Sequence, residues 1–333
     1  MSAAEREINA LMALHPKGFD LSLGRITRLL ERLSNPHEKL PPVIHIAGTN
    51  GKGSTSAFCR AILEAQGLKV HVHTSPHLVN WHERFRIGAE GGGKLVGDEV
   101  LADAVRRVAE ANQGETITVF EILTAVMFVL FSEHPADAAV IEVGLGGRFD
   151  ATNVIAHPAV SVIMSISLDH QAYLGDRVEL IAAEKAGIIK PGSPVVIGAQ
   201  SQEAAREVLV ETAERHRCPH SVYGQDFLAL EENGRLAYQD EDELLDLPLP
   251  KLAGPAPAGQ CRSSYKGVEG CRVPVERKRH SRRPGQCLLA RAAGAAHAWP
   301  ACRGRHGWRR ILDRRRTQSR RGPGHCRGDG QSQ

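Results

Sequence analysis

The stretch His45-Ile-Ala-Gly-Thr-Asn-Gly-Lys-Gly-Ser-Thr55 constrains the fold of this chain more than any other part of it. An apolar run from Pro42 to Ala47 predicts a buried strand, and a helical pattern follows from about Gly53 to Gln66. A strand, a glycine-rich loop with one lysine and a helix are the successive parts of a phosphate-binding loop. The sequence therefore predicts an α/β domain organised around such a loop.

The residue types in this loop suit phosphate chemistry. Gly48, Gly51 and Gly53 allow the backbone to turn tightly and to aim its N–H groups at one point, toward which the following helix also directs its positive end. Lys52 could then reach the terminal phosphates, and Ser54 or the threonine after it could bind Mg²⁺. The spacing is shorter than in the general P-loop pattern, so the alternative is a glycine turn that carries a solvated lysine.

Further strands and helices alternate along the chain, as expected for a mainly parallel sheet. The predicted strands are Leu68–His73, Ala138–Val143, Ala159–Ile166 and Pro194–Ile197. The predicted helices are Leu21–Leu33, Val96–Ala111, Thr118–Phe131, Val178–Ala186 and Gln202–His216. A hairpin is expected over Phe227–Tyr238 with its turn at Asn233-Gly234, followed by an extended linker over Leu244–Leu252 because prolines oppose a helix there.

Polar side chains follow three of these strands. Ser75, Glu142 and His170 each lie close to the carboxyl end of a strand, where open α/β sheets bind their ligands. Glu142 stands in an apolar run, and a carboxylate is costly to bury unless a cation or metal compensates it. We therefore expect these three residues to form a metal–nucleotide site beside the glycine loop.

Two other groups of polar residues allow a structural interpretation as well. His77, Glu83 and Arg84 follow the second strand and are candidates for the site, but a solvated loop position is the favoured interpretation for each. Thr118 and Glu121 have the spacing of a capping box at the start of an apolar helix, which competes with any ligand-binding role for them.

Composition bounds the class of protein. The chain has 333 residues, of which 42% are hydrophobic, and no run approaches about 20 uninterrupted apolar residues, so no transmembrane helix is expected. Glu5 and Arg6 precede any apolar run, so we expect no signal peptide. Of the seven cysteines, only Cys59 and Cys218 lie in the first 254 residues. These two show no metal-ligand spacing and are expected to be reduced, as in a cytoplasmic enzyme.

Seven motifs, taken in order, resemble the folylpolyglutamate synthase / dihydrofolate synthase family, relatives of the Mur peptide ligases. The motifs are Gly48-Thr-Asn-Gly-Lys-Gly-Ser54, Thr74-Ser-Pro-His-Leu78, Glu83-Arg84, Thr118-Val-Phe-Glu121, Glu142-Val-Gly-Leu-Gly-Gly-Arg-Phe-Asp-Ala-Thr-Asn153, Ser167-Leu-Asp-His170 and Glu184-Lys-Ala-Gly187. The resemblance covers roughly residues 15 to 254. It implies an N-terminal helical segment (1–40) and a Mur-ligase-like central ATP-binding domain (41–254).

The resemblance also implies roles for individual residues. ATP would bind Gly48, Thr49, Asn50, Gly51, Lys52, Gly53 and Ser54. One Mg²⁺ would be held by Ser75, Glu142 and His170, and a carbamylated Lys185 would be a ligand for a second Mg²⁺. Lys52, Lys185 and His170 would be the catalytic residues. A pterin would lie along Gly18, Phe19, Asp20 and Leu21, along Thr118, Val119, Phe120 and Glu121, and along Phe149, Asp150 and Ala151. From the residues alone, Lys185 would be interpreted as a solvated helix lysine.

The implied activity is an ATP-dependent ligase that adds L-glutamate to dihydropteroate and to tetrahydrofolate (poly)glutamates through an acyl phosphate. ATP, Mg²⁺, folates and glutamate would be its small-molecule partners; no nucleic acid or membrane partner is expected, and the family suggests a monomer. One alternative is a peptidoglycan Mur ligase, which acts on a UDP-sugar peptide. Another is a P-loop fragment without enzyme activity whose basic tail binds nucleic acid.

The last 80 residues differ sharply in charge from the rest. Residues 254–333 carry 19 Lys and Arg against 4 Asp and Glu, whereas the preceding residues carry 23 against 34. Such a basic tail is typical of nucleic-acid binding, but residues 255–333 show no sustained periodicity and would replace the family's second α/β domain. We expect that a shifted reading frame, and not nucleic-acid binding, explains the basic composition of residues 255–333.

Back-translation supports this hypothesis at two points. Shifted by one base, codons permitted for Pro255–Lys266 can read Pro-His-Gln-Leu-Asp-Asn-Ala-Gly-Ala-Ala-Ile-Arg, a helix-forming stretch. In the same frame, Leu312–Ser319 can read Trp-Ile-Asp-Gly-Gly-His-Asn-Pro, which resembles the nucleotide-binding motif of the family's second domain. We therefore expect a one-base frameshift near codon 255, a non-homologous and disordered tail, and an inactive or severely impaired chain.

Overall fold

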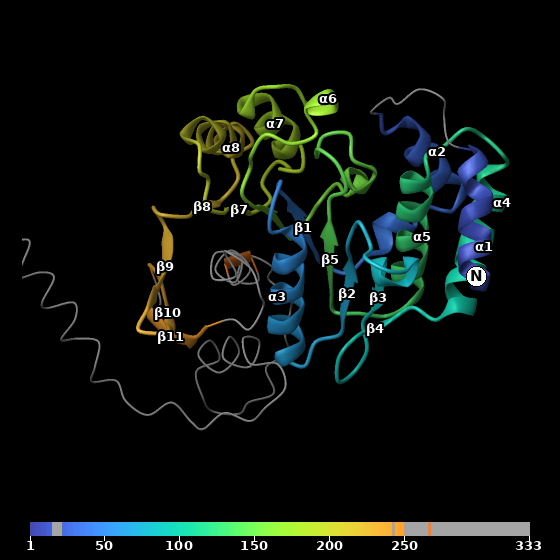
Figure 1. Cartoon of the computed structure of the whole chain (residues 1–333), viewed down its shortest axis with the longest axis horizontal. Helices are drawn as coiled ribbons and strands as arrows, with labels where there is room; N and C mark the ends of the chain where they lie inside the picture. Colours follow the sequence, from blue (N-terminus) through green and yellow to red (C-terminus); the bar gives the residue numbers. More distant parts are fainter. Residues whose placement is uncertain (15–21, 242–243, 250–265, 268–333) are drawn as a thin grey trace, which may run out of the picture. The chain divides into compact units, whose positions relative to one another are not determined.

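The computed structural model describes residues 1–14, 22–241, 244–249 and 266–267. Its main sheet has eight strands in the order β4-β3-β2-β5-β1-β6-β7-β8 (Figure 1). They are β1 (Val43–Ala47), β2 (Val70–His73), β3 (Phe85–Ile87), β4 (Lys94–Leu95), β5 (Ala138–Glu142), β6 (Val160–Ile163), β7 (Val195–Ile197) and β8 (His220–Val222). All neighbours pair in parallel except β3 and β4, which form an antiparallel edge, so the predicted mainly parallel α/β fold is confirmed.

The helices fall close to the predicted ranges. They are α1 (Ala3–Ala10), α2 (Gly24–Arg32), α3 (Lys52–Ala65), α4 (Asp98–Asn112), α5 (Val119–Glu133), α6 (Gln171–Leu174), α7 (Val178–Ala186) and α8 (Glu203–Arg215). Short 3₁₀ turns add Leu11–Leu14, Pro36–Lys39, Trp81–Arg84 and Ala151–Val154. The helix expected over Leu21–Leu33 begins only at Gly24, and it ends before Asn35-Pro36 as predicted.

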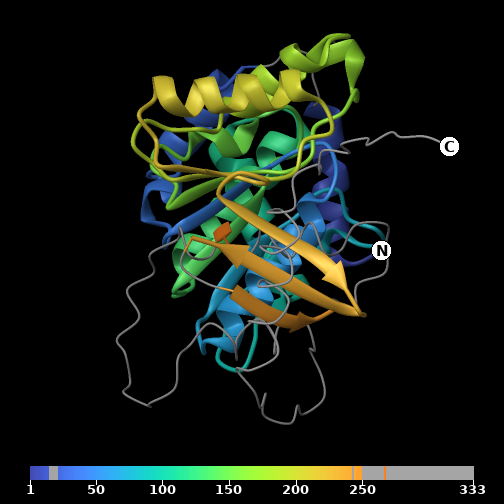
Figure 2. The same cartoon turned by 90° about the vertical axis from the view of Figure 1, so that its left-hand side faces the viewer.

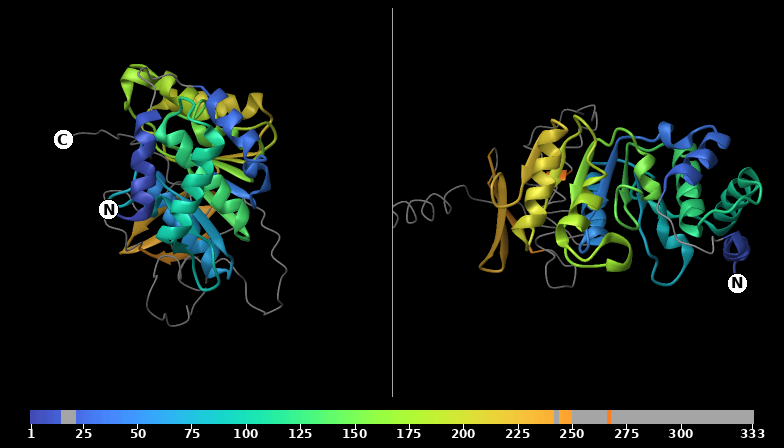
Figure 3. Two further views of the ribbon diagram at one scale, coloured as in Figure 1. Left: turned by 90° about the vertical axis from the view of Figure 1, so that its right-hand side faces the viewer. Right: turned by 90° about the horizontal axis from the view of Figure 1, so that it is seen from above.

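The central strands β1 and β5 send alternate side chains into different hydrophobic cores, because successive residues of a strand point to opposite faces. Val43 and Ile141 join a buried cluster with residues of α1, α2, α4 and α5, and α1, α4 and α5 lie side by side (Figure 3, left). Ile44 and Val140 face the opposite way and join a second cluster with α3. A third cluster joins α7 and α8 to the strands β6 and β7.

A second sheet contains β9 (Phe227–Glu232), β10 (Arg235–Asp240) and β11 (Leu244–Pro248) in the order β11-β10-β9 (Figure 2). Asn233 and Gly234 have positive φ at the turn between β9 and β10, which confirms the predicted hairpin. The prediction of a linker over Leu244–Leu252 is wrong for its first half. Leu245 and Leu247 are buried there, and β11 is an edge strand, where a proline such as Pro248 is tolerated.

The parallel register brings the functional loops to one edge of the main sheet. Ile46 of β1 pairs with Glu142 of β5 and with Val162 of β6, so these strands end at nearly the same level. The glycine loop after β1 therefore lies between the loops that follow β5 and β6. This edge is where the sequence predicts the site.

None of the helices among the described residues is long and apolar enough to cross a membrane. The predicted disordered tail over 255–333 lies outside the described residues, apart from Lys266 and Gly267. Lys266 Nζ lies 3.0 Å from Asp240 Oδ2 of β10.

Candidate active site

The glycine loop between β1 and α3 has the backbone of an anion cradle. Gly48 has φ +149°, and a Cβ at this position would lie 2.7 Å from Met164 Cβ, so no side chain fits there. Gly51 has φ +84° and ends the loop as the N-cap of α3. The N-terminus of a 14-residue helix thus faces the loop and favours bound anions.

The segment that follows β6 holds this loop in place. The backbone N–H groups of Thr49 and Asn50 both donate to the Ser165 carbonyl, at 2.9 and 3.2 Å. Thr49 Oγ1 donates to the Ser167 carbonyl and accepts from the Ser167 N–H, each over 3.1 Å. Loops from two neighbouring strands are therefore fixed to each other before any ligand binds.

Two lysines from distant helices meet at the Gly48 carbonyl oxygen. Lys52 Nζ donates to it over 3.0 Å and also to the Thr49 carbonyl over 3.3 Å. Lys185, which is only 5% exposed, donates to the same Gly48 oxygen over 3.0 Å. Burial and the nearby charge of Lys52 lower the pKa of Lys185 to about 8. Lys185 is thus not the solvated helix lysine that residue-level reasoning indicated.

Glu142 is the buried carboxylate of the site. It is 4% exposed at the end of β5, and a Cβ on Gly53 would lie 3.8 Å from its Oε2. Burial raises the pKa of Glu142 to about 7, although Lys52 and a hydrogen bond from the Ser75 backbone N–H oppose the shift. The structure therefore brings Ser75, Glu142 and Lys52 together, as the sequence predicts.

His170 stands apart from this group. Its backbone is left-handed (φ 49°) at the N-cap of α6, and its half-exposed side chain lies 3.5 Å from the Asp169 carboxylate. No contact in the described part of the chain joins His170 to Glu142. The same part contains no group of three or more His, Cys, Asp or Glu side chains that could hold a metal ion.

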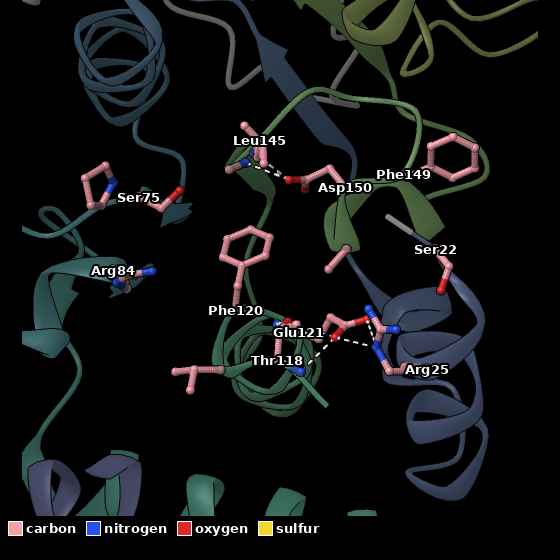
Figure 4. A pocket seen from close by; sticks show the side chains of 14 residues that line it. Ser22, Arg25, Ser75, Arg84, Thr118, Phe120, Glu121, Leu145, Phe149 and Asp150 are labelled. Carbon is pink, nitrogen blue, oxygen red and sulfur yellow. Dashed lines mark hydrogen bonds and ion pairs between the residues drawn. The ribbon is translucent and has the colours of Figure 1, made fainter. Parts of the chain in front are cut away.

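A pocket of about 310 Å³ opens next to Ser75 (Figure 4). It is lined by Ser22, Arg25, Ser75, Pro76, Arg84, Thr118, Val119, Phe120, Glu121, Gly144, Leu145, Phe149, Asp150 and Ala151. Seven of the predicted pterin-binding residues, 118–121 and 149–151, therefore line one cavity. The other predicted segment, Gly18–Leu21, lies outside the described residues, but Ser22 and Arg25 follow it directly in the chain.

Glu121 forms part of the wall of this pocket and also caps α5. Its Oε2 accepts from the Thr118 N–H at 2.9 Å and from Thr118 Oγ1 at 2.8 Å, and Thr118 Oγ1 accepts from the Glu121 N–H at 3.1 Å. The predicted capping box is thus confirmed. Arg25 of α2 also donates to both Glu121 oxygens, at 3.0 and 3.1 Å. The Glu121 side chain therefore caps a helix and lines the pocket at the same time.

Asp150 shapes the opposite part of the wall. The carboxylate is 3% exposed and accepts from the backbone N–H groups of Gly144 and Leu145, at 3.0 and 2.8 Å. Its other oxygen accepts from the N–H and the hydroxyl of Thr152, at 2.9 and 2.6 Å. Burial raises the pKa of Asp150 against these hydrogen bonds. Asp150 therefore fixes the loop that follows β5, and Phe149 beside it is 40% exposed toward the pocket.

The loop after β2 contradicts the solvated interpretation of Arg84. Arg84 is only 9% exposed, and its Nε donates to His77 Nδ1 over 2.9 Å. Glu83 is not buried, but its carboxylate accepts from the backbone N–H groups of residues 78, 79 and 80, at 2.8–3.0 Å. Sequence reasoning missed the burial of Arg84 because the burial of a loop residue depends on tertiary packing, which leaves no periodic signal.

Comparison with known proteins bears on this geometry. A family model described as the Mur ligase middle domain matches residues 46–247, more than half of the chain. The chain belongs to the Mur ligase family. The match spans the glycine loop, Ser75, Glu142, His170 and Lys185.

Several relatives carry folate-ligase names. The chain is 44% identical over 209 residues to a Bacillus subtilis dihydrofolate synthase/folylpolyglutamate synthase, which covers 61% of the chain and 47% of that protein. It is 41% identical over 196 residues to a Lacticaseibacillus casei folylpolyglutamate synthase, covering 57% of the chain and 44% of the relative. The chain thus spans about half the length of the curated relatives that it matches.

Solved structures give the same result. The apo form of L. casei folylpolyglutamate synthase superposes with a TM-score of 0.76 at 31% identity, covering 91% of this chain and 73% of that one. E. coli FolC in complex with DHPP and ADP has a TM-score of 0.76 at 30% identity, covering 88% and 66%. A folylpolyglutamate synthase/dihydrofolate synthase with Mn, AMPPNP and L-glutamate bound is also similar, with a TM-score of 0.74 at 28% identity over 90% of this chain and 67% of that one.

In this Mur ligase family member, the donor set around the glycine loop fits a nucleotide and a hard divalent cation. Two amines, a glycine cradle and a helix N-terminus suit phosphate oxygens. The Glu142 carboxylate and the Ser75 hydroxyl are oxygen donors of the kind that Mg²⁺ prefers. The raised pKa of Glu142 indicates a carboxylate that a bound cation would stabilise in its charged form.

Proposed function

We propose that the chain is an ATP-dependent ligase that joins L-glutamate to dihydropteroate and to tetrahydrofolate (poly)glutamates through an acyl phosphate. One observation carries the proposal: the phosphate-binding loop and a largely apolar pocket meet at Ser75, whose N–H bonds Glu142. A pocket of this kind, with a few convergent polar groups, suits a flat aromatic substrate. The names of the relatives support the same assignment.

The chemistry follows from the poor reactivity of a carboxylate toward amines at neutral pH. One carboxylate oxygen of the pterin substrate attacks the γ-phosphorus of ATP, and the bond to ADP breaks. The glutamate nitrogen then attacks the acyl carbon, the amide forms with loss of a proton, and phosphate leaves. Lys52 and the N–H groups at the start of α3 would offset the charge that spreads over the transferring phosphoryl group.

Ser75, Glu142, His170 and a carbamylated Lys185 are the proposed holders of Mg²⁺. The bound metal ions would neutralise the charge of the phosphates and polarise the phosphoryl oxygens. Carbamylation joins Lys185 Nζ to the carbon of CO₂ with loss of a proton, and it requires a neutral amine, which the low pKa of Lys185 favours. His170 would have to turn away from Asp169 to join this set, since its side chain now contacts that carboxylate.

The pterin is proposed to lie between Phe120 and Phe149, with its N–H groups toward Glu121 and Asp150. Aromatic rings stack favourably on a flat heterocycle, and a carboxylate accepts hydrogen bonds from ring nitrogens. This placement uses the residues that line the pocket in Figure 4. The reaction is proposed to take place in the cytoplasm, with the protein acting as a monomer.

Binding and turnover of the purified chain test the proposal. Calorimetry should detect dihydropteroate binding in the presence of an ATP analogue and Mg²⁺, and mass spectrometry should detect the glutamate adduct after prolonged incubation with ATP. A chain that binds no pterin but binds a UDP-sugar peptide would instead be a peptidoglycan Mur-type ligase. Salt-sensitive RNA or DNA binding that disappears on deletion of residues 255–333 would favour the non-enzymatic alternative.

A further inference from the structure

Within the ranges that the structure describes, Arg84 is a buried cation without an acidic partner. Its side chain lies at the end of the 3₁₀ turn Trp81–Arg84 and lines the pocket, yet the residue is only 9% exposed. The guanidinium lies 5.0 Å from the centre of the Trp81 ring, and Nε donates to His77 Nδ1. Among the described residues, no carboxylate forms an ion pair with Arg84.

The adjacent acid is not available to Arg84. Glu83 directs both of its oxygens to the backbone N–H groups of residues 78–80, which closes the loop around Arg84. Arg25, the other arginine of the pocket, is neutralised by Glu121 over 3.0 Å. Arg84 is therefore the pocket arginine whose charge remains uncompensated, and burial lowers its pKa accordingly.

The contacts of Arg84 orient its free donors. A guanidinium carries five N–H donors in one plane; Trp81 stacks near this group and His77 takes only the Nε proton. The two Nη groups remain free to bind two oxygens of one planar anion side by side. In Figure 4, the nitrogens of Arg84 point into the cavity from the side on which Ser75 lies, whereas Arg25 and Ser22 lie on the opposite side.

Ser75 and Glu142 connect this side of the pocket to the glycine loop. Ser75 lies on the same side as Arg84 and bonds Glu142, whose carboxylate feels the charge of Lys52. An anion held by Arg84 would thus lie at the end of the pocket nearest to the nucleotide. Glu121 and Arg25 would remain at the far end for the neutral heterocycle.

We propose that Arg84 binds the carboxylate of the pterin substrate and selects acids over neutral pterins. This inference rests on the proposed function and adds a specificity-determining residue to it. A bidentate contact from Arg84 would leave the remaining lone pairs of the carboxylate for attack on phosphorus. Trp81 and His77 act on substrate choice only through the orientation of Arg84.

The test compares an acid with its neutral isostere. Calorimetry with the full chain, an ATP analogue and Mg²⁺ should give tighter binding of dihydropteroate than of its carboxamide by about 10- to 100-fold, the range for hydrogen bonds between charged groups. Arg84→Met should reduce this ratio to near one, and Arg84→Lys should restore only part of it. Arg86→Gln is the matched control, because Arg86 lies two residues further along the chain in β3, donates to the Gly93 carbonyl and does not line the pocket; it should keep the full ratio.

Each outcome decides the proposal. Equal binding of the two ligands by the unchanged chain would overturn it without any variant, as would an unchanged ratio in folded Arg84→Met. If neither pterin binds the unchanged chain, the proposed function fails and this inference fails with it. Binding of both pterins without preference would leave the proposed function standing and remove only the role of Arg84.

Discussion

Lys52 and Lys185 donate hydrogen bonds to the same oxygen atom, the Gly48 carbonyl, each over 3.0 Å. One lysine comes from the first turn of α3 and the other from the last turn of α7. The nearby charge of Lys52 is one cause of the lowered pKa of Lys185. The loop, the nucleotide site and the proposed carbamate are therefore electrostatically linked.

Lys52→Met should weaken binding of an ATP analogue by about 10- to 100-fold, because the loss removes one charged hydrogen-bond donor from the phosphates. Calorimetry in Mg²⁺ measures the effect. Lys69→Met, at a partly exposed surface lysine whose Nζ lies 3.9 Å from Glu90 Oε1, should leave the dissociation constant unchanged. Unaltered affinity in Lys52→Met would exclude the proposed phosphate contact.

Lys185 should form a carbamate. With a pKa of about 8, roughly a tenth of its side chains are neutral at pH 7, far more than for an ordinary lysine. Nuclear magnetic resonance with ¹³C-bicarbonate should show a carbamate signal that Lys185→Arg abolishes. Lys190→Arg, which changes another lysine whose pKa is lowered by burial, should retain it. A signal that survives Lys185→Arg would assign the modification to another amine.

Glu142 should make the stability of the metal-free protein depend on pH. Its folded pKa of about 7 lies above the ordinary value of 4.5, so the folded state holds this proton more tightly than the unfolded state does. The contribution to the free energy of unfolding is complete below pH 4.5 and is lost as the pH rises through about 7, by roughly 2–3 kcal/mol.

Urea denaturation in EDTA measures this loss. Glu142→Gln should flatten the decline between pH 5 and 8, whereas Glu90→Gln, at an 89% exposed carboxylate, should follow the unchanged chain. Added Mg²⁺ should reduce the difference, because a bound cation favours the charged carboxylate. An identical slope in Glu142→Gln would contradict the buried titration.

Gly144→Ala should reshape the pocket with little effect on folding. A Cβ on Gly144 would lie 2.3 Å from the Cζ atom at the tip of the Phe120 ring, so the ring must turn. We expect pterin binding to fall at least about 10-fold while the free energy of unfolding changes by less than about 1 kcal/mol. Gly97→Ala, which meets no atom within 4 Å, should leave pterin binding unchanged. Unchanged binding in Gly144→Ala would place the ligand away from Phe120.

The reading-frame hypothesis is tested on the gene and on the protein. Resequencing codons 245–265 should reveal an extra or missing base, and expression from the corrected frame should raise ligase turnover by at least about 100-fold through new positioning contacts. Nucleotide binding by the glycine loop should persist in both proteins. Normal turnover by the chain as given, with residues 255–333 in place, would refute the hypothesis.

Local sequence rules account for much of the fold. The glycine loop, the capping box of Thr118 and Glu121 and the turn at Asn233-Gly234 depend on neighbouring residues, so the sequence predicts them directly. The sequence predicts a linker over Leu244–Leu252 because of its prolines, but Leu244–Pro248 forms a strand that depends on pairing with β10. The partners of a strand lie elsewhere in the chain and leave no local signal.

The residues of the candidate site also fall into those that the sequence predicts and those that it does not. Glu142 is recognisable as a charge in an apolar strand, but the burial of Arg84 arises from a loop that folds back over Trp81 and His77. The contact of Lys185 with Gly48 joins α7 to the glycine loop, two segments that lie 137 residues apart in the chain, so no periodicity predicts it. Sequence reasoning therefore identifies a residue such as Glu142, whose charge contrasts with its apolar neighbours in the chain. It misses Arg84 and Lys185, whose burial and contacts depend on tertiary packing.

Glu121 closes the first turn of α5, neutralises Arg25 and forms part of the pocket wall with a single carboxylate. A substitution of Glu121 that altered ligand choice would also remove the capping box at the start of α5. Evolution therefore has little freedom to tune recognition through Glu121. We expect diversification of substrate preference to proceed instead through neighbours such as Ser22 and Phe149, whose side chains hold no helix end in place.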